Sequence, residues 1–321
     1  MIKIECPQIC DSINVRRDNL KKSIENWIYS EALINLIKIF GGKIPSNLDF
    51  YEYICYINEF AEVWNYRKRQ DGSTERWAVV DDDLTLKYAD VILDTAKELG
   101  LMGRGFPKGD IDYVLPLGGA RLTNYTRPQM AKQIVDLKKE NSVKIVALTG
   151  KRPINEIEIP FLQEYAPLAK TEYEAICGGI EKAFGIEKGD YLETNYVTNN
   201  INLQWSIREY MEKECRNEIF VLAAPSSEAN RRANSYDTFL FFLKRFYIVE
   251  GNRILLVTSD IYAPFQLLKF IPIALERNIY VDCVGVNGNM MGNSFNKPSN
   301  YCQEIKATIN AIKVIADLYW K

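Results

Sequence analysis

The stretch that decides the fold is Asp112–Arg121, DYVLPLGGAR, in which a short apolar run leads directly into two glycines. Four more short apolar runs follow along the chain, and stretches with a helical pattern separate them. The five runs cover residues 113–117, 143–148, 219–223, 254–257 and 279–286. Continuous runs rich in Val, Ile and Leu are typical of strands covered on both faces. The alternation of strands and helices predicts an α/β fold with a doubly wound, mostly parallel, Rossmann-like sheet.

Helical patterns occupy the intervals between and after these runs. The expected helices cover residues 128–139, 171–185, 201–214, 231–246, 263–277 and 300–318. The chain before the first run also reads as helical, near residues 18–40, 50–64 and 84–100. We therefore expect an N-terminal helical region, residues 1–105, packed on a Rossmann-like α/β domain, residues 106–321. The short turn between them lacks the Gly/Ser-rich composition of a flexible linker.

Composition narrows the range of functions. The 321 residues carry 40 basic and 42 acidic side chains, a net charge of −2 that favours neither a nucleic-acid nor a membrane partner. Histidine is absent, which excludes a Ser-His-Asp triad and His-ligated zinc or haem. The seven cysteines form no CxxC pair, which argues against a zinc site. With no signal-peptide pattern at the N-terminus, we expect a cytoplasmic protein.

The turns that follow the predicted strands carry the candidate binding site, because parallel sheets bind ligands at the carboxyl ends of their strands. Glycine lets the backbone approach a ligand, the next helix offers free N–H groups, and arginine suits phosphate or carboxylate groups. A small anionic ligand is the expected partner, and ordinary polar loops are the alternative. The candidate ligand-binding residues are Gly118, Gly119, Arg121, Thr149, Gly150, Lys151, Arg152, Ser226, Ser227, Arg231, Asn234, Thr258, Ser259 and Tyr262.

Three carboxylates are candidates for acid–base or metal chemistry. Glu174 and Asp237 fall at or within the helices that follow the strands, and Glu228 lies in the turn after the third. We expect them to approach the edge of the sheet from the side. The cofactors that such a site would take are a nucleotide, S-adenosylmethionine or a divalent metal.

Several of these motifs resemble the YdcF/SanA/ElyC family in kind and in order. They are DYVLPLGGAR, VALTG, TEYEAICGGIEKAFGI, RANSYDT and ILLVTSDIYAPFQLLKF, and the resemblance covers about residues 110–286. It implies a Rossmann-like fold and a bacterial protein linked to envelope biogenesis or to binding of a nucleotide-type cofactor. The family's second glycine motif is only half met, because Lys151 follows Thr149 and Gly150. The family's histidine falls on Tyr262, and a tyrosine does not shuttle protons readily at neutral pH.

Three hypotheses for function follow. The first is an enzyme that transfers or hydrolyses a group on a phosphorylated or nucleotide-like small molecule. The second is a non-catalytic sensor of such a ligand, which the missing histidine favours. The third is an interaction protein that docks a partner through the aromatic-rich helix near residues 50–66. The sequence leaves the oligomeric state open.

Overall fold

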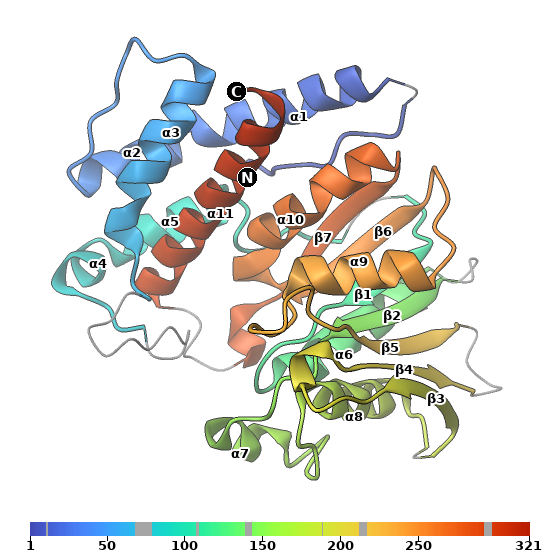
Figure 1. Cartoon of the computed structure of the whole chain (residues 1–321). Coiled ribbons are helices and arrows are strands. Elements are labelled where there is room, and N and C mark those ends of the chain that lie inside the picture. Colours follow the sequence, from blue (N-terminus) through green and yellow to red (C-terminus); the bar gives the residue numbers. More distant parts are fainter. Residues whose placement is uncertain are drawn as a thin grey trace. The chain divides into compact units, whose positions relative to one another are not determined.

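Seven strands form one sheet in the order β3-β4-β5-β2-β1-β6-β7 in a computed structural model of the chain (Figure 1). The structure describes residues 1–10, 12–67, 79–106, 109–138, 143–187, 189–211, 217–291 and 297–321. The strands are β1 (Tyr113–Pro116), β2 (Lys144–Thr149), β3 (Tyr191–Tyr196), β4 (Trp205–Tyr210), β5 (Ile219–Ala223), β6 (Arg253–Ser259) and β7 (Tyr280–Val286). Five of them, β5-β2-β1-β6-β7, run parallel, and β3 and β4 are antiparallel additions next to β5.

The mostly parallel α/β fold predicted from the sequence is confirmed. All five expected strands are present, and each lies within or close to its expected bounds. The helix predicted over residues 201–214 is wrong, because residues 205–210 form β4 and pair with the unpredicted strand β3. In β4 the side chains alternate between the two faces of the sheet. The pairing of β4 with β5 and β3 therefore outweighs its helical propensity.

The chain divides into two compact units. Unit 1 comprises Met1–Gly105, Asp260–Asn278 and Asn287–Lys321, and unit 2 comprises Phe106–Ser259 and Ile279–Val286. This division shares the expected boundary near residue 105, but it assigns two C-terminal segments to the N-terminal helical unit. Among the described residues, we find no helix with the length and apolar character needed to cross a bilayer.

Unit 1 consists of helices. They are α1 (Ile13–Ile28), α2 (Glu31–Ile39), α3 (Phe50–Phe60), α4 (Asp83–Lys87), α5 (Ala89–Glu98), α10 (Ala263–Glu276) and α11 (Pro298–Tyr319), with short 3-10 turns at Ala61–Trp64, Asp260–Tyr262 and Gly288–Met291 in the described part of the unit. The helix expected over residues 18–40 is two helices, because Ser30 ends the first run and caps α2 through a bond from the Leu33 N–H. Helix α11 is the central helix of the unit and packs against α3, α5 and α10.

Unit 2 contains the sheet and its covering helices. Helices α6 (Thr123–Leu137) and α8 (Glu172–Phe184) cover one face, and α9 (Ser235–Arg245) covers the other (Figure 1). Gly179 of α8 lies against the backbone of Asn124 in α6, so a side chain at this position would overlap the Asn124 carbonyl oxygen. The short α7 (Ile159–Leu162) lies in the segment between β2 and α8, whose ends pair through Pro153 and Thr171.

Candidate functional site

The carboxyl ends of β1 and β2 lie next to each other and carry two loops, residues 117–122 and 150–153. The strands β1 and β6 are parallel neighbours, but the chain leaves them towards opposite sides of the sheet. After β1 it continues to β2 on one side, and after β6 it continues to β7 on the other. Such a reversal of strand order is where open α/β sheets bind their ligands. The order of the strands therefore points to the loop after β1 and the loops beside it.

The loop after β1 is tightly fixed by hydrogen bonds. The Gly118 N–H donates to the Leu148 carbonyl at 2.7 Å, and Gly119 and Asn124 exchange two bonds of 2.9 and 2.8 Å. A Cβ at Gly118 would lie 2.6 Å from both the Glu172 Oε1 and the Thr149 Oγ1. Glycine is needed at position 118 because this loop lies directly against the end of β2 and the start of α8.

Backbone N–H groups remain available in both loops. Within the part of the chain that the structure describes, the N–H groups of Ala120, Leu122, Gly150, Lys151 and Arg152 have no hydrogen-bond acceptor. All five residues are half-buried. Leu122 immediately precedes α6, where the helix dipole adds positive potential. Backbone amides gathered in this way favour an anion.

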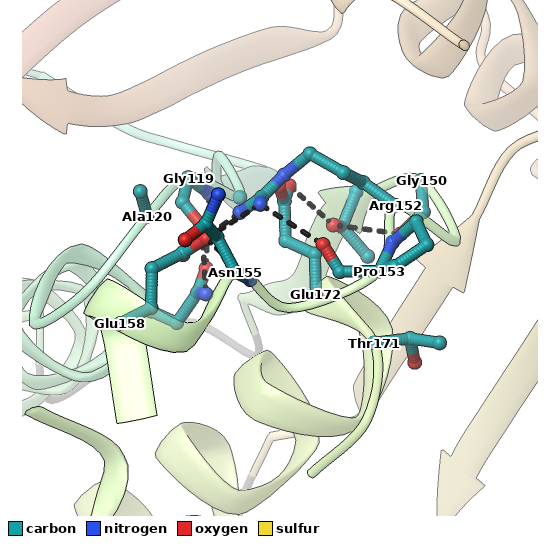
Figure 2. Close-up of polar contacts among 12 residues, drawn as sticks. Gly119, Ala120, Gly150, Arg152, Pro153, Asn155, Glu158, Thr171 and Glu172 are labelled. Carbon is teal, nitrogen blue, oxygen red and sulfur yellow. Dashed lines mark hydrogen bonds and ion pairs between the residues drawn. The ribbon is translucent and has the colours of Figure 1, made fainter. Parts of the chain in front are cut away.

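Arg152 is the centre of an ion-pair network beside these amides (Figure 2). Its guanidinium binds Glu158 through two bonds of 2.6 and 3.0 Å, and its Nε binds Glu172 at 2.8 Å. Glu158 also accepts the Arg121 N–H at 3.3 Å, so it links the two loops. Glu172 accepts a 2.8 Å bond from the Thr149 hydroxyl. The network fixes both loops relative to each other.

Electrostatics hold the network in its charged form. Burial alone would raise the pKa of Glu158, whose side chain is fully buried, but the bonds from Arg152 outweigh it and leave this pKa below its ordinary value. Burial would lower the pKa of Arg152, and the two carboxylates instead raise it. Arg152 was expected to bind a ligand anion, yet two protein carboxylates already occupy its guanidinium.

Lys151 differs from Arg152. Its ammonium lies 5.8 Å from the centre of the Tyr173 ring, and it forms no ion pair with any described residue. The Arg121 guanidinium packs over the Phe161 ring at 5.0 Å. Arg121, Lys151 and Arg152 are the three cationic residues of the two loops.

The turn after β5 forms a second polar cluster. Arg231 binds Asp237 at 2.5 Å, Glu228 at 2.9 Å and the Ser227 hydroxyl at 2.6 Å. Asn234 caps α9, and the Ser226 hydroxyl accepts the Glu228 N–H. This turn lies beside the loop after β2, because a Cβ at Gly150 would be 3.5 Å from that of Ala233. Arg231 is thus neutralised within its own turn.

The three expected acid–base residues all have structural partners. Glu174 accepts the Thr171 and Lys170 N–H groups in the capping box that begins α8. Asp237 closes the equivalent box of α9 and binds Arg231, which outweighs its burial and lowers its pKa. Glu228 is engaged by Arg231 as well. None of the three is placed as a free base at the amides of the two loops.

The end of β6 contributes differently from the other strand ends. The Ser259 hydroxyl accepts a 3.0 Å bond from Arg127, which also donates to the Leu117 and Gly118 carbonyls. Thr258 is buried, and its hydroxyl has no partner among the described residues. Tyr262 is buried within unit 1.

Sequence reasoning missed the residues that organise the site: Glu158, Glu172, Arg127 and Asn124. One signal was available for Glu158, since Asn155 and Glu158 have the spacing of a capping box and form one. Nothing in the spacing of Glu172 shows that it contacts Gly118. Among the described residues, no group of three or more acidic or cysteine side chains is arranged to hold a metal ion.

Comparison with known proteins identifies relatives of the whole chain. A family model described as the Rv3785 N-terminal domain matches residues 11–100. Similar proteins are Uncharacterized protein Mb3814 of Mycobacterium bovis and Uncharacterized proteins MT3893 and Rv3785 of Mycobacterium tuberculosis. Each is 26% identical over 327 residues, covering 93% of this chain and 90% of the relative. No solved structure matches the chain significantly. The likeness to these mycobacterial proteins thus includes both compact units.

Proposed function

We propose that unit 2 binds a small molecule carrying a phosphate or similar anionic group at the carboxyl ends of β1 and β2. One observation carries the proposal. Five backbone N–H groups without acceptors among the described residues lie on two adjacent glycine-containing loops, with the unpaired Lys151 ammonium on the second. Backbone amides and an ammonium together match the oxygen atoms of a phosphate group.

The surroundings of the loops support an anion over a neutral ligand. The carboxylates of Glu158 and Glu172 are both engaged by Arg152, so they contribute little repulsion. Gly150 has no side chain beside its own amide, and a Cβ there would contact the Ala233 Cβ at 3.5 Å. The absence of a side chain at this position favours close approach of an oxyanion to the backbone.

A nucleotide-like ligand fits the proposal best. The parallel strands of the sheet follow the order of folds that bind nucleotides at the reversal beside β1. The resemblance to the YdcF/SanA/ElyC family over residues 110–286 points the same way. The binding test of this proposal also includes S-adenosylmethionine, sugar nucleotides and a divalent metal carried by the ligand. We further propose that the protein acts in the bacterial cytoplasm, with neither nucleic acid nor membrane as its partner.

A binding protein without catalysis is favoured over an enzyme. Transfer or hydrolysis needs a base near the bound group, and Glu174, Glu228 and Asp237 are all held in caps or ion pairs. Glu172 also lies against the loops, but Arg152 and the Thr149 hydroxyl already bind its carboxylate oxygens. We therefore propose a sensor or carrier of the ligand, with a transferase or hydrolase as the second candidate.

Thermal-shift measurements followed by calorimetry test the proposal. The full chain is screened against inorganic phosphate, pyrophosphate, adenine and guanine nucleotides, sugar nucleotides and S-adenosylmethionine, each with and without magnesium. A ligand that binds the folded state raises the melting temperature. Each compound that binds is then incubated with the protein, and chromatography measures whether it is converted. Conversion indicates an enzyme, and binding without conversion indicates a sensor. The proposal fails if no phosphate-bearing compound binds, or if binding is unchanged in the Lys151→Ala variant.

A further inference from the structure

Strand β3 forms an open edge of the sheet in unit 2. Among the described residues it pairs only with β4, and Figure 1 shows it as the last strand on that side. From Leu192 to Tyr196 every residue is exposed, including Leu192 at 61% and Tyr196 at 54%. An edge of this kind offers a row of unpaired backbone groups to another strand.

The usual protections of an edge strand are missing from β3. It contains no proline, lysine or glycine, and its register with β4 runs from Tyr191 to Tyr196 without a bulge. Its only charge, Glu193, is bound by Arg208 at 2.9 and 3.0 Å. Natural sheets normally block free edges with such devices. Their absence indicates that this edge is used for pairing.

The backbone geometry shows which groups are free. The Met211 N–H donates to the Asp190 carbonyl at 3.1 Å, so Asp190 and Met211 are a hydrogen-bonded pair of the hairpin. In an antiparallel hairpin such pairs recur at every second residue. Leu192, Thr194 and Tyr196 therefore direct their N–H and C=O groups towards β4. Tyr191, Glu193 and Asn195 direct theirs outwards, to the open edge.

We propose that β3 pairs antiparallel with β3 of a second copy of this chain, with the two-fold axis at Thr194. Glu193 disfavours the neighbouring register, in which the axis passes through that residue, even though Arg208 binds its carboxylate. An axis at Glu193 would place the two Glu193 carboxylates directly opposite each other, which is unfavourable. An axis at Thr194 instead places Glu193 opposite Asn195 of the second copy. A two-fold symmetric contact of this kind closes after two copies.

The same register also matches the apolar side chains. It places Leu192 opposite Tyr196 of the second copy, on one face of the joined sheet. This is a non-hydrogen-bonded pair, in which side chains approach most closely. Leu192 and Tyr196 are largely exposed in the single chain, so this contact would bury apolar surface, and the two-fold axis creates it twice. The occupant that fits this edge is therefore a second copy.

Cysteine cross-linking of the full chain tests both the contact and its register. At the proposed axis, the two Cα atoms of Thr194 would be about 4.5 Å apart, within the range that a disulfide spans. Thr194→Cys should therefore form a covalent dimer under mild oxidation. Asn195→Cys is the matched control because it leaves the Glu193 carboxylate in place. It should cross-link no more than the wild-type protein, whose own cysteines, among them the partly exposed Cys10 and Cys55, set the background.

Light scattering provides the second measurement. The wild-type protein should have twice the 37.0 kDa chain mass at tens of micromolar. Asn195→Pro should shift it to the monomer with an unchanged circular dichroism spectrum, because that N–H is not used by β4. A wild-type monomer at every concentration would overturn the proposal. So would equal cross-linking of the Thr194→Cys and Asn195→Cys proteins.

Discussion

Replacing Arg152 by alanine should destabilise the protein in a strongly pH-dependent way. The change leaves the fully buried Glu158 without its ion-pair partner and Glu172 with only the Thr149 hydroxyl. Breaking a buried ion pair by removing one partner costs about 3–5 kcal/mol. We expect a loss of that size in the free energy of unfolding at neutral pH.

The pH dependence follows from Glu158. In the wild-type protein its pKa lies below the ordinary value, so the ionised carboxylate stabilises the fold above about pH 4.3 and this gain is lost in acid. Without Arg152, burial dominates and raises the pKa, so the variant loses stability as the pH rises. The difference between the two proteins should therefore shrink towards pH 4.

Urea unfolding followed by circular dichroism, between pH 4 and pH 8, measures this difference. Lys132→Ala is the control, because it removes an exposed pair with Asp136 and should cost no more than about 1 kcal/mol at any pH. Adding Glu158→Gln to Arg152→Ala should restore part of the lost stability, because it removes the fully buried Glu158 charge. The reasoning is refuted if the loss is below about 1 kcal/mol, or if it is the same at both ends of the pH range.

Three further predictions concern binding, loop packing and unit 1. Lys151→Ala should weaken binding of the tightest phosphate-bearing ligand, measured by calorimetry, about tenfold or more, which corresponds to about 1.4 kcal/mol. Lys144→Ala, at the other end of β2, is the control and should leave this affinity unchanged. Gly118→Ala should lower the melting temperature, because its Cβ would lie 2.6 Å from a carboxylate oxygen, and Gly150→Ala should not; equal melting temperatures would contradict the packing. Burial raises the pKa of Asp260, so the urea midpoint of the wild-type protein should fall as the pH rises through that pKa, and Asp260→Asn should remove the fall.

Much of the sheet could be predicted because its central strands are apolar throughout. Residues 113–116 and 219–223 are buried or nearly so, and their continuous Val, Ile and Leu pattern has no helical period. The β3–β4 hairpin could not be found in this way. Residues 192–196 are exposed and carry no continuous apolar run, and only their pairing with β4 makes them a strand.

The site was predictable in its backbone but not in its side chains. The glycines at 118, 119 and 150 follow buried strands, so their place at the sheet edge followed from chain order alone. The partners of Arg152 depend on a turn and a helix that return to it from later in the sequence. The spacing of these residues in the sequence does not show that Glu158 and Glu172 contact Arg152, which is why Arg152 was expected to bind a ligand.

Amide hydrogen exchange with and without a bound nucleotide tests the central claim most directly. The full chain is measured with saturating amounts of the tightest ligand found in the thermal-shift screen. We predict slower exchange in peptides covering residues 118–123 and 149–153, where the free N–H groups lie. The β3–β4 hairpin should remain unchanged. Protection confined to other parts of the chain, with these two loops unaffected, would contradict the account.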